Sequence, residues 1–184
     1  PVWLNIFSIS SWEKISPLGN STSYSSDILN EGFLVNPQGQ LPLGTPYFNL
    51  SSELVGLVSD SSPSAAIAPS YGLKSALDAY LSSKKTVRPQ LGIQYLPLFN
   101  ISSQKNFALI YGDNLATAVA PNGPAAKAKL KSGDIIQAIN DKDIDVLSES
   151  IFSTLSRYKI GDKISLKYDR GGVTNLVQIT LVSN

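Results

Sequence analysis

The sequence of 184 residues contains neither cysteine nor histidine. The absence of cysteine excludes disulfides, thiol chemistry and cysteine-based zinc sites within this chain. The absence of histidine removes the usual general base at neutral pH and the commonest metal ligand, so these residues alone cannot assemble a Ser-His-Asp triad. The acidic residues also show no spacing typical of a metal site or of paired-carboxylate catalysis. We therefore expect no metal and no cofactor.

The net charge is also small, and long apolar runs are absent. Lys and Arg number 15 against 14 Asp and Glu, and the net charge of +1 gives no electrostatic reason to expect a nucleic acid as partner. No stretch approaches the roughly 20 apolar residues of a membrane span. A hydrophobic content of 42% excludes a disordered chain. Because the sequence begins with Pro1 rather than Met, we expect a longer protein, with room for a membrane anchor upstream of Pro1.

The first half of the sequence is predicted to form mainly strands and turns. Short apolar runs lie between segments rich in Ser, Asn, Gly and Pro. Leu73, Leu77 and Leu81 recur at helical spacing, and Ser70 is a candidate N-cap for this helix. The predicted strands are residues 2–9, 32–35, 47–50, 53–58 and 65–68, and residues 10–27 are predicted to form a long loop.

The second half alternates predicted strands with short helices. Pro124 occupies a favourable first helical position, and Ser148 is a plausible N-cap for a later helix. A polar and basic stretch that ends at Pro89 marks the expected domain boundary. The predicted strands are residues 91–96, 115–119, 135–139, 163–168 and 175–181, the last two forming a hairpin, and the predicted helices are 125–130 and 148–158.

Four motifs stand in a fixed order along this half: QLGI at 90–93, GPAAKA at 123–128, LKSGDII at 130–136 and GD at 161–162. The ordered set resembles the PDZ domain of the HtrA family of serine proteases. The resemblance implies an α+β PDZ domain at residues 88–184. One departure is Lys129, where the family usually has Gly. A Lys at this position disfavours a left-handed backbone. Asp134 is expected to cap a local amide.

The first half is similar to the end of the trypsin-like second barrel that precedes this PDZ domain in the family. The segments at 44–57 and 66–70, the helix and the linker carry this resemblance. The fold class implied for the whole chain is mainly β with a few helices. A partial, degenerate trypsin-like β-barrel would occupy residues 1–86, and the PDZ domain would follow.

The position of the family's nucleophilic serine is assigned here to Leu43, which has no group that can attack a carbonyl. A second candidate is Ser21, because the tripeptide Gly-Asn-Ser at 19–21 resembles the family's nucleophile motif. Thr22 and Ser23 follow it instead of glycines, however, and the gap to the strand at 32–36 is long. We therefore expect no catalytic residue in this chain.

The PDZ resemblance implies a groove that binds peptides. QLGI is the expected carboxylate-binding loop, since successive backbone amides can converge there on an anion. The next strand would accept a peptide by β-augmentation, and one or two apolar residues of the helix at 148–158 would line the pocket for its last side chain. The alternatives are a turn without a ligand and a strand edge covered by other protein. The candidate peptide-binding residues are Gln90, Leu91, Gly92, Ile93, Gln94, Tyr95, Ile151, Phe152 and Leu155.

The combined interpretation is a proteolytically inactive HtrA-like pseudoprotease that binds polypeptide C-termini or exposed apolar peptides through its PDZ domain. One alternative is a fragment of an active serine endopeptidase whose remaining catalytic residues lie upstream. Another is a purely structural role in assembly. The family resemblance further implies protein quality control in the bacterial cell envelope or another extracytoplasmic location, and it allows a homo-oligomer.

Overall fold

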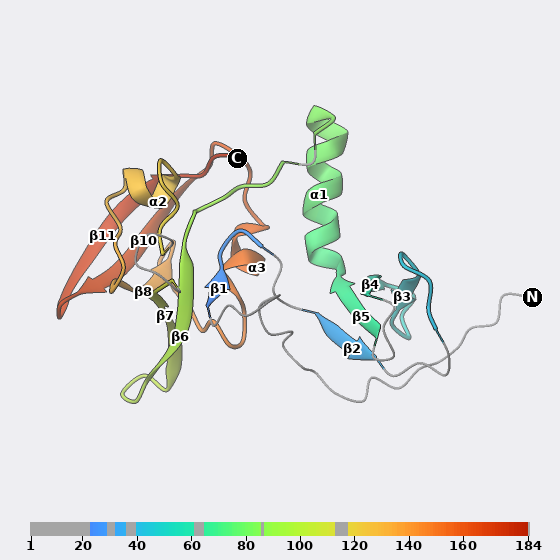
Figure 1. The fold of residues 1–184 in the computed structure, drawn as a ribbon, viewed down its shortest axis with the longest axis horizontal. Helices are drawn as coiled ribbons and strands as arrows, with labels where there is room; N and C mark the ends of the chain where they lie inside the picture. The colour runs from blue at the N-terminus through green and yellow to red at the C-terminus, as the bar shows by residue number, and fades with distance from the viewer. Residues whose placement is uncertain are drawn as a thin grey trace, which may run out of the picture. The chain divides into compact units, whose positions relative to one another are not determined.

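The computed structural model describes residues 23–28, 32–35, 40–60, 65–85, 87–112 and 118–183. These residues form mostly β-strands with a few helices, as the sequence predicts (Figure 1). The chain divides into two compact units, one of Pro1–Ser16 with Asn30–Lys74 and the other of Pro17–Leu29 with Ser75–Asn184. Part of the loop predicted at 10–27 thus belongs to the same unit as the C-terminal half. The division into domains at 1–86 and 88–184 stays a prediction.

The first unit contains a four-stranded antiparallel sheet in the order β2-β5-β4-β3. Its elements are β2 (Phe33–Val35), β3 (Pro46–Phe48), β4 (Leu54–Asp60) and β5 (Ala65–Pro69), and α1 (Ser70–Ser83) begins directly after β5. The core of this sheet consists of four buried side chains, those of Val35, Val58, Ala65 and Ile67. The strands predicted at 32–35, 47–50, 53–58 and 65–68 and the helix at 73–81 are confirmed, whereas the strand predicted at 2–9 lies outside the described residues.

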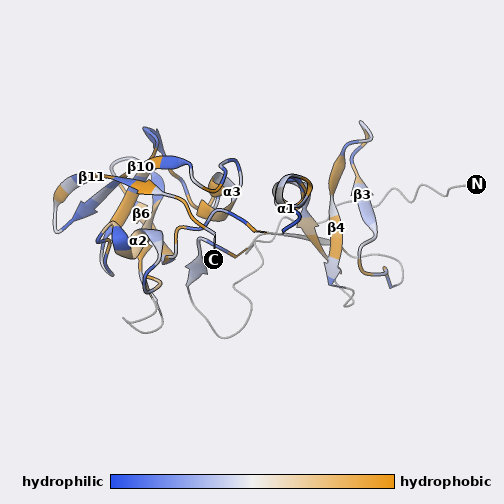
Figure 2. Cartoon of the chain, turned by 90° about the horizontal axis from the view of Figure 1, so that it is seen from above, coloured by the Kyte–Doolittle hydropathy of each residue, from blue (hydrophilic) through white to orange (hydrophobic). Residues whose placement is uncertain are grey.

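The second unit is built on a larger antiparallel sheet in the order β1-β6-β7-β8-β10-β11, with β9 paired to β8. Ile164, Leu166 and Tyr168 are buried at alternate positions of β10, so one face of this strand meets the core. In Figure 2 the hydrophobic colours follow strands such as β6. The elements are β1 (Tyr24–Ser25), β6 (Gln94–Asn100), β7 (Lys105–Ile110), α2 (Pro124–Lys127), β8 (Ile135–Ile139), β9 (Lys142–Asp143), α3 (Ile151–Leu155), β10 (Lys163–Arg170) and β11 (Val173–Thr180).

Several strands of the second unit differ from the prediction. β1 lies inside the predicted loop at 10–27, and β7 was not predicted at all. β6 begins at Gln94 rather than at residue 91, because Gln90 and Ile93 form only isolated bridges. The strand predicted at 115–119 falls largely on residues outside the described part of the chain. The hairpin of β10 and β11 is confirmed.

The helix α3 is shorter than the predicted helix at 148–158, and its N-cap is Ser150 rather than Ser148. The hydroxyl of Ser150 accepts a hydrogen bond from the amide of Ser153 at 3.0 Å, which satisfies a free donor in the first turn. Ser148 instead donates its hydroxyl to Asp145 at 3.1 Å, in the turn that precedes the helix. Ser148 thus belongs to the turn at Asp145, and Ser150 begins the helix.

Lys129 adopts the left-handed backbone that its side chain was expected to disfavour, with φ at 60°. A non-glycine residue in this region costs about 1–2 kcal/mol. The turn is held by Arg170, whose guanidinium donates to the carbonyl of Lys129 at 2.9 Å. Arg170 also binds both carboxylate oxygens of the buried Asp134, at 2.6 and 2.7 Å. Asp134 caps the amide of Lys131 at 2.8 Å, as predicted.

Candidate peptide-binding groove

The loop at 90–93 presents two consecutive backbone amides to one carboxylate. Gly92 has a φ of 81°, in the left-handed region that favours glycine. The amide of Leu91 donates to Oδ1 of Asp27, and the amide of Gly92 donates to Oδ2, both at 2.9 Å. Each carboxylate oxygen thus has its own N–H donor, which is the arrangement of an anion nest. The bound carboxylate belongs to the same chain.

The third amide of the loop is used differently. The amide of Ile93 donates to the hydroxyl oxygen of Ser26 at 3.1 Å, and that hydroxyl donates in turn to Oδ1 of Asp27 at 2.8 Å. The amide of Ser26 donates to the carbonyl of Ile93 at 2.9 Å. Ser26 is almost completely buried. The pair Ser26-Asp27 therefore satisfies all three amides from Leu91 to Ile93.

The segment before Asp27 runs antiparallel to β6. In the register of this pairing, Tyr24 lies opposite Tyr95 and Ser25 lies opposite Gln94. The rings of Tyr24 and Tyr95 are stacked, with centroids 5.8 Å apart. Figure 1 draws β1, in blue, alongside β6 on the side where α3 lies. A strand added to the edge of β6 and ending in a carboxylate is the geometry of β-augmentation, achieved here within one chain.

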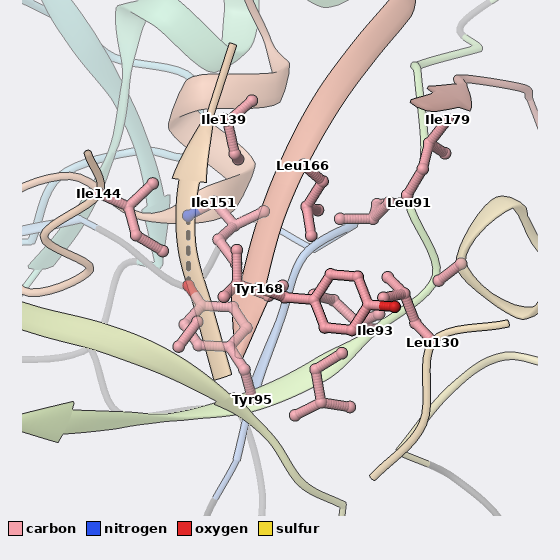
Figure 3. Close-up of a cluster of buried hydrophobic side chains, with 14 of the residues drawn as sticks. Leu91, Ile93, Tyr95, Leu130, Ile139, Ile144, Ile151, Leu166, Tyr168 and Ile179 are labelled. Carbon is pink, nitrogen blue, oxygen red and sulfur yellow. Dashed lines mark hydrogen bonds between the residues drawn. The ribbon is translucent and has the colours of Figure 1, made fainter. Parts of the chain in front are cut away.

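The side chains of most candidate residues are core rather than groove surface. Leu91, Ile93, Tyr95, Ile151 and Leu155 are all buried in one hydrophobic cluster. Figure 3 shows how Tyr95 ties the strand to the helix, since its phenol oxygen accepts a hydrogen bond from the amide of Ile151 at 3.3 Å. The loop and β6 therefore bind residues 24–27 mainly through their backbone, while these side chains fill the core.

A small apolar pocket lies at one side of α3. Of the three candidate residues on the helix, Phe152 and Leu155 line this pocket and Ile151 does not. The guanidinium carbon of Arg88 stands 5.4 Å from the centroid of the Phe152 ring, a cation–π contact. The pocket is lined by Arg88, Pro89, Phe152, Leu155 and Ser156.

Sequence reasoning missed two groups of residues at this site. Arg88 and Pro89 were interpreted as linker, and residues 23–27 as loop. The local signal for the second group is weak, because Ser-Tyr-Ser-Ser-Asp has no apolar alternation and the partner loop is 64 positions away. An acidic residue within a short polar segment is compatible with too many roles to identify this one.

The residues considered for catalysis lie in the first half of the chain. Leu43 is exposed and stands in a turn beside Gly44, whose amide donates to the carbonyl of Val58 at 2.8 Å. Ser21 lies outside the described residues. In the described part of the chain there is no cluster of acidic residues that could hold a metal ion. None of the helices described is long and apolar enough to cross a membrane.

Residues 89–181 match the family described as PDZ domain. The serine protease Do-like HtrB of Bacillus subtilis is 29% identical over 168 residues, which cover 84% of this chain and 36% of that protein. A probable periplasmic serine endoprotease, DegP-like, of Marinomonas sp. is 33% identical over 147 residues, 75% of this chain and 31% of that protein. This chain thus spans about a third of the length of these curated relatives.

Among solved structures, the HtrA-type protease AlgW with tripeptide has a similar fold. The TM-score is 0.59 at 16% identity, and the likeness covers 91% of this chain and 56% of that chain. AlgW has also been solved with a decapeptide, where the TM-score is 0.58. The likeness extends over both halves of the chain and therefore concerns the arrangement of strands in each.

Proposed function

Because the chain belongs to the PDZ domain family and is HtrA-like, we propose that its groove binds the free C-terminus of another polypeptide. One observation carries this proposal. The loop at 90–93 directs the amides of Leu91 and Gly92 at the two oxygens of a carboxylate. A terminal carboxylate carries the same charge and the same two acceptor oxygens as the side chain of Asp27.

The bound peptide would use the contacts that residues 23–27 make. Its terminal carboxylate would accept hydrogen bonds from Leu91 and Gly92, and charge-assisted bonds of this kind contribute about 1.5–3 kcal/mol. The amide of its last residue would donate to the carbonyl of Ile93, as that of Ser26 does. The preceding residues would pair with β6 beside Tyr95. This mode gives affinity through the backbone and leaves selectivity to side-chain pockets.

The apolar pocket at α3 would have to widen to admit the last side chain of a peptide, and its walls favour an apolar one. Phe152 and Leu155 supply its hydrophobic wall, and Pro89 closes it without offering a backbone donor. Ser26 stands at the position of the last residue and has a side chain too small to bury much apolar surface. A larger apolar side chain would gain about 25 cal/mol for each Å² that it buries there. The peptides solved with AlgW support peptide binding by this fold.

A pair of labelled peptides tests the proposal. The first ends in an apolar residue with a free carboxylate, and the second is identical but amidated at its C-terminus. We expect the free acid to bind at least tenfold tighter in a titration followed by fluorescence anisotropy, about 1.4 kcal/mol. The amide removes the charge and one acceptor while leaving every side chain in place. Equal affinities for the two peptides would contradict the proposal.

For the first half we propose an inactive protease part, with Leu43 in place of the nucleophile. A second candidate, an active endopeptidase that uses Ser21, has one observation in its favour: the strand expected after that serine is present as β2. A fluorophosphonate probe applied to the full-length protein separates the two. We expect no labelling, and labelling that a Ser21→Ala change abolishes would support the active enzyme.

A further inference from the structure

The groove of this protein is already filled by its own chain. We propose that Ser23–Asp27 is an internal ligand, which occupies the peptide groove with the carboxylate of Asp27 on the loop and so competes with incoming C-termini. That the segment competes with incoming C-termini rests on the proposed function. That it occupies the groove rests only on its contacts with the loop and β6. The segment belongs to the same compact unit as the groove.

The segment reproduces the carboxylate and backbone contacts that a bound peptide would make. A carboxylate sits on the amides of Leu91 and Gly92. The amide of the residue before it, Ser26, donates to the carbonyl of Ile93. Two residues further back, Tyr24 pairs with Tyr95. The segment has no aliphatic side chain for the apolar pocket, and it binds through its backbone, the carboxylate of Asp27, the hydroxyl of Ser26 and the ring of Tyr24.

The segment is also organised internally for this role. The amide of Asp27 donates to the hydroxyl oxygen of Ser25 at 3.2 Å, and the hydroxyl of Ser26 donates to Oδ1 of Asp27 at 2.8 Å. The hydroxyl of Ser23 reaches the side-chain oxygen of Gln94 at 3.4 Å. These bonds orient the side chain of Asp27 toward the loop at 90–93, although Asp27 is not the end of the chain. A carboxylate borne on a side chain thereby reaches a site suited to a chain terminus.

An internal ligand lowers the apparent affinity for any other ligand. The apparent dissociation constant rises by the inverse of the fraction of molecules whose groove is open. A groove that is open in about one molecule in ten therefore binds peptides about tenfold more weakly than a free groove. The tether also gives the segment a high effective concentration, which a peptide in solution must exceed.

The test compares the whole chain with Asp27→Asn. The side-chain amide keeps the shape of the carboxylate but turns one acceptor into a donor that faces the amide of Gly92 or Leu91. A second variant, Tyr24→Pro, removes a backbone donor and the stacked ring. Asp78→Asn serves as the control, because Asp78 is an exposed carboxylate on α1 and its change removes the same charge.

The first readout needs no peptide. Hydrogen exchange at the amides of Leu91 and Gly92 should be at least tenfold faster in both variants than in the unchanged chain and in Asp78→Asn. Unchanged exchange at these two amides would overturn the internal ligand, whatever the groove binds. The second readout is the affinity for a fluorescein-labelled free-acid peptide, Thr-Ser-Tyr-Ser-Leu, with its amidated form for comparison.

The two readouts separate the two proposals. Faster exchange together with at least tenfold tighter binding of the free acid supports both. Faster exchange without any preference for the free acid over the amide keeps the occupancy and contradicts the proposed function. A clear preference for the free acid, with equal affinity in the unchanged chain and in Asp27→Asn, keeps the proposed function and overturns the competition.

Discussion

The phenol oxygen of Tyr95, on β6, accepts a hydrogen bond from the amide of Ile151, the first residue of α3. This bond, between groups that are buried, joins the strand and the helix, which are the two walls of the proposed groove. Since the first amides of a helix have no partner within the helix, the phenol satisfies a donor that would otherwise be left buried and unpaired. One hydroxyl group thus links β6 to the first turn of α3.

Removing that hydroxyl should destabilise the second unit. We expect Tyr95→Phe to lower the free energy of unfolding by about 1–3 kcal/mol, because it strands the amide of Ile151. Urea titration should show a lower midpoint with an unchanged slope. Tyr158→Phe is the matched control, since the hydroxyl of Tyr158 accepts from Asn140 in an exposed setting. Equal losses in the two variants would contradict the account.

We expect substitutions of Gly92 to be poorly tolerated, because its φ is positive and because little space surrounds its Cα atom. A Cβ atom there would lie 3.1 Å from the Cβ of Ala120, at a φ of 81°. Gly133 also has a positive φ but open space around it. We expect Gly133→Ala to cost about 1–2 kcal/mol of stability and Gly92→Ala clearly more, measured by thermal unfolding. Gly92→Val would therefore disturb the fold, and a loss of peptide binding in that variant would not isolate the carboxylate site.

The buried carboxylate of Asp134 should depend on Arg170. Hydrogen bonding to Asp134 raises the pKa of the Arg170 guanidinium, which stays charged beside this carboxylate. We expect Arg170→Gln to destabilise the protein by about 3 kcal/mol, because it leaves a buried charge with only the amide of Lys131. The exposed pair of Lys105 and Asp143 provides a control. Lys105→Gln should change the stability by less than about 1 kcal/mol in the same urea titration.

Residues 87–184 should fold without the rest of the chain. The large hydrophobic cluster, apart from its contact with Tyr24, is built from residues 91–181. We expect a cooperative melt by circular dichroism, and a dye-binding, non-cooperative state would show that β1 is needed for folding. An acetylated and amidated peptide with the sequence of residues 22–28 should bind this piece. The same peptide with Asn in place of Asp should bind at least tenfold more weakly, about 1.4 kcal/mol.

Much of the fold could be predicted because its signals are local. Two apolar runs around a Gly-Gly turn predict the hairpin of β10 and β11, and branched apolar residues predict the strand β8. Ser150 could not be chosen over Ser148 in the same way. Both serines are capable N-caps, and the bond that Ser148 makes with Asp145 in the preceding turn has no signature in the local sequence.

Of the proposed site, the sequence predicts the loop but not the segment that occupies it. The glycine of QLGI identifies a loop where amides can approach an anion, and the ordered motifs placed it beside a strand and a helix. The occupant could not be predicted, because Tyr24 and Ser25 take their strand conformation from pairing with Tyr95 and Gln94. A strand of two residues carries no periodicity of its own, and its stability comes from contacts far away in the sequence.

Pro97 limits what can be added to the outer edge of β6. The carbonyl of Ile93 faces β1, and the carbonyl of Gln94 faces Tyr111 on the opposite side. Backbone groups alternate between the two edges of a strand, so the nitrogen of Pro97 lies on the edge that β1 covers, and proline has no hydrogen to donate there. If β1 leaves, the open edge spans only residues 93–95 before it is interrupted. That opening is long enough for a short tail but too short to template a continuous sheet between molecules, which guards the ligand-free protein against edge-to-edge aggregation.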